Sequence, residues 1–326
     1  MVRVARGAGG VEVRIDAPPA LSIARMTAGK PPEEAARLAG LVFNACSAAQ
    51  EGAARAAFGL PPAPGAARRI AEEALRDHAL KLALIWPEAL GLEADRAALA
   101  AVPLIKHDHG ETLSKALFGR NGPPRRLAEF EAWMATAETT PARVFDRLWR
   151  VWDSRWGRAT PPIWRPGLPF VEVDWLEGEI DGRPVETSVA ARVADDDLLR
   201  EIEARRGRGI LWRLAARIAD AARLLEELPD GAPSATPVEI EPGLGAAPAA
   251  RGTMLARGVV ERGRVTQYAR LSPTDCALHP HGLLAHVFDS LPRRGRTPLE
   301  RVAAFALESV DPCLPYRLVM EDRRRG

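Results

Sequence analysis

The sequence predicts an α+β fold that is mainly helical, on three observations. Near the N-terminus, short segments alternate apolar and polar residues between Gly and Pro, a pattern typical of strands. Long segments with apolar residues at i, i+4 and i+7 spacing follow and indicate helices. One more pair of strands comes late in the chain. Because strands and helices do not alternate, the order argues against a doubly wound sheet.

The first elements are short strands followed by one long helix. The strands are expected at residues 2–4, 11–15 and 21–25. The helix begins at Pro31 and Pro32, because proline suits the first helical turn and the glutamates that follow suit the positive end of the helix dipole. It is expected to run to about Phe58 and to stop at Gly59. Its apolar face includes Cys46, so this thiol is expected to point into the interior.

The rest of the chain is expected to be mostly helical. Further helices are expected at residues 66–86, 94–117 (interrupted near Pro103), 125–156, 195–228 (interrupted near 207–209) and 298–310. Aromatic residues recur at helical spacing in the segment 125–156, which is typical of a core-facing stripe. A late hairpin pairs residues 253–260 with 264–271 across a turn that contains Gly263.

Two stretches rich in Pro and Gly separate these helices. Residues 157–184 are expected to form an irregular loop with one hairpin at 170–179, and residues 229–250 are expected to form a second irregular loop. The tryptophans of the first stretch favour a loop packed on the body of the protein over a linker. Residues 1–326 are therefore expected to form a single domain.

The composition argues against several classes of function. Lys and Arg number 45 and Asp and Glu number 43, so the net charge of +2 does not predict a nucleic-acid or membrane partner. Three cysteines do not make a disulfide framework and indicate a reducing compartment. The sequence shows no secretory signal and no apolar stretch long enough to span a membrane, so a cytoplasmic location is expected. It also contains no standard nucleotide-binding or hydrolase motif.

Two of the three cysteines are candidate metal ligands. Cys313 follows Asp311 and Pro312, so a fixed backbone precedes it, and a cysteine at a helix end near charged groups is readily held as a thiolate. Soft thiolates select iron, copper or zinc over hard cations. Because Cys46 lies near the other end of the chain, the pair predicts one site closed by both ends. Either cysteine taken alone is better explained as a small buried apolar residue.

The remaining candidate ligands have simpler interpretations. Cys276 is followed by His279 and His281, but these spacings match no recognised zinc motif, and a turn after a strand explains them better. His107 and His109 flank an aspartate in an expected helix break, which is typical of a solvated turn.

The ordered motifs of the chain resemble those of the large subunit of nickel–iron hydrogenases. In that family two C-x-x-C pairs, one near each end, hold the active site, and the tail pair reads D-P-C-x-x-C-x-x-H. Here residues 311–319 read DPCLPYRLV, and residues 41–50 read LVFNACSAAQ where the family has R-x-C-G-x-C-x-x-x-H. Other matching segments follow in the same order at 77–80 (S-H-A-L), 184–192 (P-x-E-x-G-P-L-A-R), 250–252 (the segment whose arginine lies over the iron's diatomic ligands) and 273–274 (P-T).

The departures from the large-subunit pattern change what the resemblance implies. Phe43 and Tyr316 replace two of the four cysteines, and Gln50 and Val319 replace two histidines. The glutamate-containing R-x-E-G-H segment has no counterpart around residues 7–13, and the chain is shorter than an ordinary large subunit. Four thiolates hold nickel beside iron in the enzymes. The resemblance to this pattern therefore implies no nickel and no hydrogen turnover, whereas two thiolates can still hold a single iron.

The pattern is similar to that of the HupK/HoxV-type hydrogenase assembly proteins, which are shortened and large-subunit-like. Segments 77–92 and 271–283 look closer to that branch than to the enzymes. The resemblance implies a shortened large-subunit-like fold and a non-catalytic accessory protein of hydrogenase maturation. It would act as a scaffold or carrier for iron that bears cyanide and carbon monoxide. Its partners would be other maturation proteins and the immature large subunit.

The same resemblance implies a role for each residue of the site. Cys46 and Cys313 would donate thiolates to iron, and Arg251 would donate hydrogen bonds to a cyanide nitrogen. His78 would orient a neighbouring group, although a histidine on an apolar helix face is more often a core residue. Asp311 would pair with a cation or cap backbone donors. An alternative stays open: a metal-free protein that docks maturation factors or the immature large subunit, with the cysteines as relics.

Overall fold

The computed structural model describes residues 2–6, 11–15, 23–43, 46–169, 172–175, 179–292, 298–313 and 318–321. Its α-helices are Ile23–Thr27 (α1), Pro32–Val42 (α2), Ser47–Ala57 (α3), Ala66–Leu80 (α4), Trp86–Ala89 (α5), Arg96–Ala101 (α6), Ile105–Asp108 (α7), Glu111–Phe118 (α8), Leu127–Thr136 (α9), Thr140–Val151 (α10), Val189–Arg192 (α11), Asp197–Arg206 (α12), Ile210–Glu227 (α13), Pro273–Leu278 (α14), Leu283–Asp289 (α15) and Leu299–Val310 (α16). A π-helical turn, Lys81–Ile85, joins α4 to α5.

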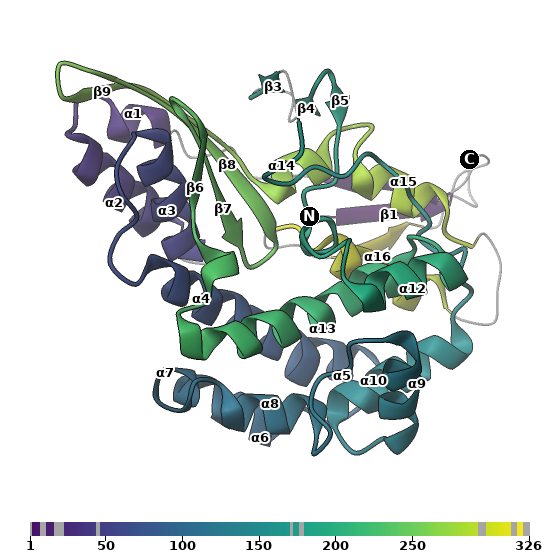
Figure 1. The fold of residues 1–326 in the computed structure, drawn as a ribbon. Coiled ribbons are helices and arrows are strands. Elements are labelled where there is room, and N and C mark those ends of the chain that lie inside the picture. Colours follow the sequence, from purple (N-terminus) through teal and green to yellow (C-terminus); the bar gives the residue numbers. More distant parts are fainter. Residues whose placement is uncertain are drawn as a thin grey trace.

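Helices α4, α8, α11, α12 and α16 pack against α13, the longest helix of those described, which is buried along most of its length. Figure 1 shows α13 across the middle of the molecule, with α5 to α10 on one side of it and the sheets on the other. The aromatic stripe expected in segment 125–156 lies in the core, where Phe130, Trp133 and Trp152 are buried. Among the described residues, no helix is both long and apolar enough to cross a membrane.

Three small sheets complete the fold in the described part of the chain. Val2–Arg6 (β1) pairs antiparallel with Val11–Ile15 (β2) and parallel with Leu318–Glu321 (β10). Val173–Asp174 (β3), Glu179–Ile180 (β4) and Arg183–Pro184 (β5) form a second sheet. The third sheet is antiparallel, in the order Val238–Glu241 (β6), Leu244–Ala249 (β7), Gly252–Glu261 (β8) and Arg264–Leu271 (β9).

Most expected elements are present, including the late hairpin, which is β8 and β9. The hairpin expected at 170–179 is represented by the β3–β4 pair, although Phe170, Val171 and residues 176–178 lie outside the described residues. The strand expected at 21–25 is wrong in its described part, because residues 23–27 form α1. There the buried Thr27 hydroxyl donates to the Ile23 carbonyl at 3.0 Å, a helical contact that the alternating pattern did not reveal.

The single helix expected from Pro31 to Phe58 is wrong. Helix α2 ends at Val42, and Cys46 is the residue before α3 rather than a residue inside a continuous helix. The carboxylate of Glu73 accepts the backbone N–H of Ala48 at 2.9 and 3.1 Å, so a distant side chain satisfies one of the free donors at the start of α3. Apolar spacing continues through the break, which is why the pattern predicted one helix.

The segment 125–156 is also two helices rather than one. Ala137, at a φ of +50°, ends α9. Helix α10 then begins after Thr139, whose hydroxyl accepts the Ala142 N–H at 3.3 Å. This Thr-x-x-Ala start, with Pro141 in the first helical turn, is a local capping signal that the aromatic spacing obscured.

The irregular loop expected at 229–250 is wrong in its second half, which contains β6 and β7. Strand β7 is made of Gly, Ala, Leu and Pro, and small residues are poor predictors of strands. They are needed here because α3 lies directly against β7. A Cβ atom on Gly245 would lie 2.5 Å from both the Ala53 carbonyl oxygen and the Ala57 nitrogen.

Gly252 begins β8 beside the functional region, and its replacement tests the close packing there. Its φ is +139°, and a Cβ would lie 2.1 Å from the Thr187 carbonyl oxygen. Gly252→Ala is expected to lower the free energy of unfolding by about 1–3 kcal/mol from overpacking, in addition to backbone strain. At Gly263, φ is +74° and a Cβ meets nothing within 4 Å, so Gly263→Ala is expected to cost about 1 kcal/mol from strain alone. If urea denaturation gave the two variants the same loss of unfolding free energy, the steric argument would be contradicted.

Candidate metal centre

The fold brings Cys46 and Cys313 together. Their thiols lie close enough for each to shift the pKa of the other, although one precedes α3 and the other follows α16. The backbone N–H of Ala250, in the turn between β7 and β8, also donates to the Cys46 sulfur. The N–H of Cys313 donates to the Thr274 hydroxyl at 2.7 Å, which fixes the tail next to the start of α14. Cys46 is buried and Cys313 is exposed, so the pair can be reached from one side.

The two thiols differ in proton affinity. The hydrogen bond from Cys46, opposed by burial and assisted by the positive charge of Arg251, lowers the pKa of Cys313 to about 6. The same hydrogen bond, together with burial, raises the pKa of Cys46 above its usual range. At neutral pH the pair therefore holds one proton, which Cys46 donates to the Cys313 thiolate. A thiolate is the form of cysteine that binds metals.

This asymmetry predicts the pH dependence of alkylation. Iodoacetamide is expected to modify Cys313 with a midpoint near its pKa of about 6, because the reactive thiolate is present above that pKa. Cys46→Ala removes the donor and is expected to raise the midpoint by about 1–2 units, since a hydrogen bond to a charged group contributes about 1.5–3 kcal/mol. Cys46→Ser retains an O–H donor and should keep a low midpoint. Mass spectrometry of the Cys313 peptide measures the profile, and an unchanged midpoint in Cys46→Ala would contradict the assignment.

Arg251 lies in the turn between β7 and β8 and faces the cysteine pair. Its guanidinium approaches Asp77 Oδ1 at 3.5 Å and Asp311 Oδ2 at 3.4 Å, and it donates to the Pro312 carbonyl at 3.3 Å. These contacts fix the guanidinium without using all five of its N–H donors. The side chain is 20% exposed, so a ligand at the cysteines can reach the remaining donors.

Asp311 ends α16 in the left-handed region, at a φ of +50°, and is buried. Its carboxylate pairs with Lys81 at 2.9 Å, with Arg217 and with Arg251. The sequence-based expectation that Asp311 pairs with a cation agrees with this geometry, and the number of cations was not foreseen. Any contact of Asp311 with a bound ligand stays a prediction.

His78, in α4, is fully buried. Its Nδ1 accepts from Arg217 at 2.6 Å, and its Nε2–H donates to Asp220 Oδ2 at 2.8 Å. A ring that accepts at one nitrogen and donates at the other is neutral, and burial lowers the pKa of His78 in agreement with this state. Both ring nitrogens are therefore occupied by protein groups, so any effect of His78 on a ligand would pass through these neighbours.

Several residues of this region were missed by the sequence reasoning. Lys81 is buried and also pairs with Glu308 at 2.8 Å, and Trp86 Nε1–H donates to the same carboxylate at 2.9 Å. Arg217 pairs with Asp77 at 2.8 Å. The available signal was the occurrence of charged residues within apolar helical segments, because buried charges need partners. The identity of those partners depends on the tertiary fold.

The other candidate ligands lie apart from this pair. Cys276 packs with a separate apolar cluster that includes Trp164, and burial raises its pKa to about 12. It belongs to helix α14 rather than to the expected turn. His107 is exposed at the end of α7. Within the described ranges, no group of three or more His, Cys, Asp and Glu side chains is arranged to hold a metal ion.

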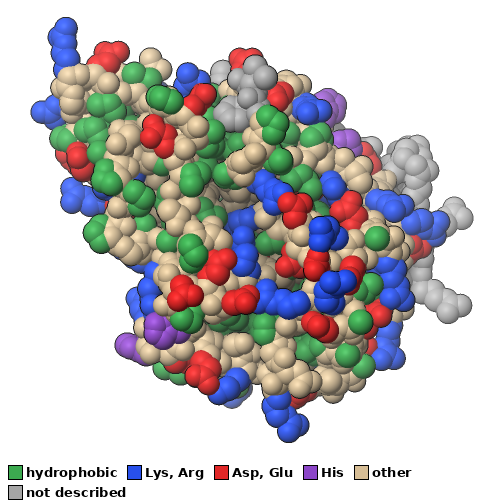
Figure 2. All heavy atoms as spheres, viewed as in Figure 1, with side chains coloured by type: hydrophobic (Ala, Val, Ile, Leu, Met, Phe, Trp, Pro, Cys, Tyr) green, Lys and Arg blue, Asp and Glu red, His purple; other side chains and the backbone are tan. Residues whose placement is uncertain are grey.

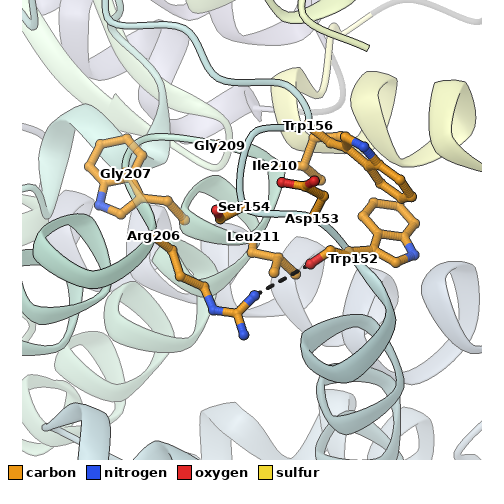
Figure 3. A pocket seen from close by; sticks show the side chains of 10 residues that line it. Trp152, Asp153, Ser154, Trp156, Arg206, Gly207, Gly209, Ile210 and Leu211 are labelled. Carbon is orange, nitrogen blue, oxygen red and sulfur yellow. Dashed lines mark hydrogen bonds between the residues drawn. The ribbon is translucent and has the colours of Figure 1, made fainter. Parts of the chain in front are cut away.

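A small cavity elsewhere has a structural explanation. It lies between the end of α10 and the start of α13 and is lined by Trp152, Trp156 and Arg206 (Figure 3). Its volume of about 10 Å³ suits one water molecule. Arg206 donates to the carbonyls of Trp149 at 3.1 Å and Trp152 at 3.4 Å, which satisfies acceptors at the C-terminal end of α10.

On the face shown in Figure 2, basic and acidic side chains are interspersed.

Comparison with curated proteins identifies the family. The chain is 37% identical over 304 residues to the hydrogenase expression/formation protein HupK of Rhodobacter capsulatus, covering 93% of this chain and 91% of that protein. The chain belongs to the HupK family of hydrogenase expression/formation proteins. The chain is also 26% identical over 354 residues to the hydrogenase expression/formation protein HoxV of Cupriavidus necator, covering 90% of this chain and 88% of that protein. It is 26% identical over 330 residues to HupK of Azotobacter vinelandii, covering 92% of this chain and 91% of that protein. No family model matches the sequence.

Solved structures confirm the expected fold class of this HupK-family chain. The Ni-Fe-Se hydrogenase from D. vulgaris Hildenborough, in the as-isolated oxidized state, matches with a TM-score of 0.61 at 14% identity, covering 94% of each chain. The NAD⁺-reducing [NiFe]-hydrogenase in the H₂-reduced state matches with a TM-score of 0.60 at 16% identity, covering 94% of this chain and 93% of that one. The neighbours are nickel–iron hydrogenase large subunits, and at such identity the likeness shows the fold alone.

Proposed function

We propose that this HupK-family chain serves hydrogenase maturation as a scaffold or carrier for iron that bears cyanide and carbon monoxide. The observation that carries the proposal is the contact between the Cys46 and Cys313 thiols, which come from distant parts of the chain. Iron is a fitting cargo because thiolates are soft ligands. The family membership supports a role in hydrogenase formation.

The protonation of the pair supports capture of a metal fragment. The Cys313 thiolate is already present at neutral pH and would bind first. Cys46 would then bind as its proton is released, because a thiol must lose its proton to become a metal ligand. The N–H of Ala250, which already points at the Cys46 sulfur, would stabilise the second thiolate.

Arg251 would recognise the ligands of the cargo. A cyanide nitrogen bound to iron accepts hydrogen bonds, and the guanidinium offers N–H donors beside both sulfurs. Its positive charge would also offset the negative charge of two thiolates and cyanide. Because Asp77 and Asp311 hold the guanidinium, its position would not have to be reorganised on binding.

The proposal assigns only two protein donors to the iron and leaves the other positions to the cargo's own ligands. Fewer protein bonds favour release, which a carrier requires. Two thiolates do not reproduce the four-thiolate nickel site, so the proposed role is non-catalytic and without nickel. The proposed partners are other maturation proteins and the immature large subunit, and the proposed location is the cytoplasm.

Infrared spectroscopy tests this proposal. The wild-type protein, purified without oxygen from cells that contain the proteins that make the iron ligands, is expected to show cyanide and carbonyl stretching bands. Iron analysis of the same sample is expected to give the metal that accompanies them. Absence of these bands from a folded wild-type protein would reject the carrier function and favour a metal-free docking role.

A further inference from the structure

The turn that carries Arg251 is held at both ends by one buried side chain. Arg192, the last residue of α11, donates from NH1 to the carbonyl of Ala249 at 2.7 Å and to the carbonyl of Gly252 at 3.1 Å. These residues flank Ala250 and Arg251, the residues that face the cysteine pair. The Arg192 side chain is 8% exposed, so water does not compete effectively for these carbonyls.

Arg192 is itself held by Asp220 of α13. Its Nε donates to Oδ1 at 3.1 Å and its NH2 donates to Oδ2 at 2.6 Å, a two-bond geometry that fixes the plane of the guanidinium. Asp220 is fully buried, and two flanking arginines and the hydrogen bond to His78 outweigh burial and hold its pKa well below the usual range. It is therefore a permanent carboxylate that orients Arg192.

The contacts continue from Asp220 to the site and close a ring. Asp220 accepts from His78, His78 accepts from Arg217, and Arg217 pairs with Asp77. Asp77 then approaches Arg251, the residue in the turn that Arg192 holds. The turn is thus held at two places. Arg192 holds its backbone carbonyls, and Asp77 holds the guanidinium of Arg251.

We propose that Arg192, oriented by Asp220, is a positioning residue that sets where the Ala250 N–H and the Arg251 guanidinium point at the cargo. This inference rests on the proposed carrier function. A buried arginine that only stabilises the fold would have no reason to bond the carbonyls of this turn in particular. Both carbonyls bonded by Arg192 instead flank the two donors that face Cys46 and Cys313.

The chain offers a matched control on the same carboxylate. Arg223 pairs with Asp220 Oδ1 at 2.7 Å, but its side chain is 28% exposed, and this ion pair lies within α13 rather than in the turn. Arg223→Met therefore removes an ion pair of Asp220 without removing a bond to the turn. Arg192→Lys keeps a positive charge beside Asp220, but a single ammonium group cannot reproduce the planar fork that spans the carboxylate and both carbonyls. Arg192→Met removes every donor.

Two readouts on full-length protein test the inference separately from the function. Without cargo, hydrogen exchange measured by mass spectrometry is expected to be faster in the peptide containing residues 249–253 of Arg192→Lys than in wild type and in Arg223→Met. With cargo, infrared spectra of Arg192→Lys are expected to show shifted cyanide bands and iron loading reduced about 10- to 100-fold, the usual effect of removing a group that orients a metal ligand set. Arg223→Met is expected to keep the wild-type bands.

A folded Arg192→Lys protein with wild-type exchange in the turn, or with wild-type bands and loading, would overturn the inference. The Arg192→Lys comparison does not depend on whether the Arg192→Met variant folds. If wild type itself shows no cyanide bands, the carrier function fails, whereas the exchange comparison still decides whether Arg192 fixes the turn. Circular dichroism and urea denaturation identify the variants that are folded.

Discussion

Replacement of both Cys46 and Cys313 by serine is expected to reduce iron, cyanide and carbonyl in the purified protein to background. The two sulfurs are the donors that the proposal assigns to iron, and a neutral hydroxyl is a poor substitute for a thiolate. Hydrogenase activity in cells that depend on this chain for maturation is expected to fall with the loading. Infrared spectroscopy, iron analysis and a hydrogenase assay measure the three effects.

The third cysteine provides the control for this replacement. Cys276→Ser changes a thiol to a hydroxyl in a buried site that is separate from the pair. It is expected to retain loading, although its stability can fall because a hydroxyl is buried in an apolar cluster. If the double variant is folded and supports normal hydrogenase maturation, the cysteines are relics and a docking function replaces the carrier function.

Arg217→Met is expected to lower the free energy of unfolding by about 3–5 kcal/mol. Arg217 is buried between Asp77, His78 and Asp311, and its removal leaves buried carboxylates that have lost a main partner. The exposed pair of Arg205 and Glu131, at 2.7 Å, provides a comparison. Arg205→Met is expected to change stability by less than about 1 kcal/mol, because exposed ion pairs contribute little. Urea denaturation measures both values.

The pH dependence of unfolding gives a second check on Arg217. Burial raises the pKa of Asp77, but Arg217 and Arg251 outweigh it and lower that pKa to about 2 from an ordinary value of 3.8. A lowered pKa contributes stability above the ordinary value, and this contribution is lost as the pH falls from 3.8 towards 2. Arg217→Met is expected to weaken that acid-dependent loss. A pH profile identical to wild type would show that Arg217 does not hold the Asp77 charge.

The sequence was sufficient to find the cysteine pair because its signals are rare and local. The chain has only three cysteines, so each is a conspicuous candidate ligand, and Asp311-Pro312-Cys313 is a compact motif. The helical segments were predictable because apolar spacing reports the buried face of a helix. Arg251 and His78 were found only through the order of motifs along the chain.

The remainder of the site depends on contacts that no local pattern contains. His78 and Asp220 are 142 positions apart, and Arg217 reaches Asp311 across 94. Secondary-structure propensity also fails to predict an element where tertiary contacts decide it. Glu73 accepts a hydrogen bond at the start of α3, and Gly245 allows α3 to lie against β7. Such features become visible when the chain is folded, because their partners are distant in sequence.

The separation of the two sulfurs has a consequence for the timing of assembly. Cys46 precedes α3, whereas Cys313 lies between α16 and β10, the strand that pairs with β1. At a synthesis rate of about 5–20 residues per second, the second thiol emerges on the order of tens of seconds after the first. Until then the nascent chain lacks Cys313, so the proposed pair of iron ligands cannot form. Under the proposed carrier function, loading of the pair would therefore be a late, post-translational event.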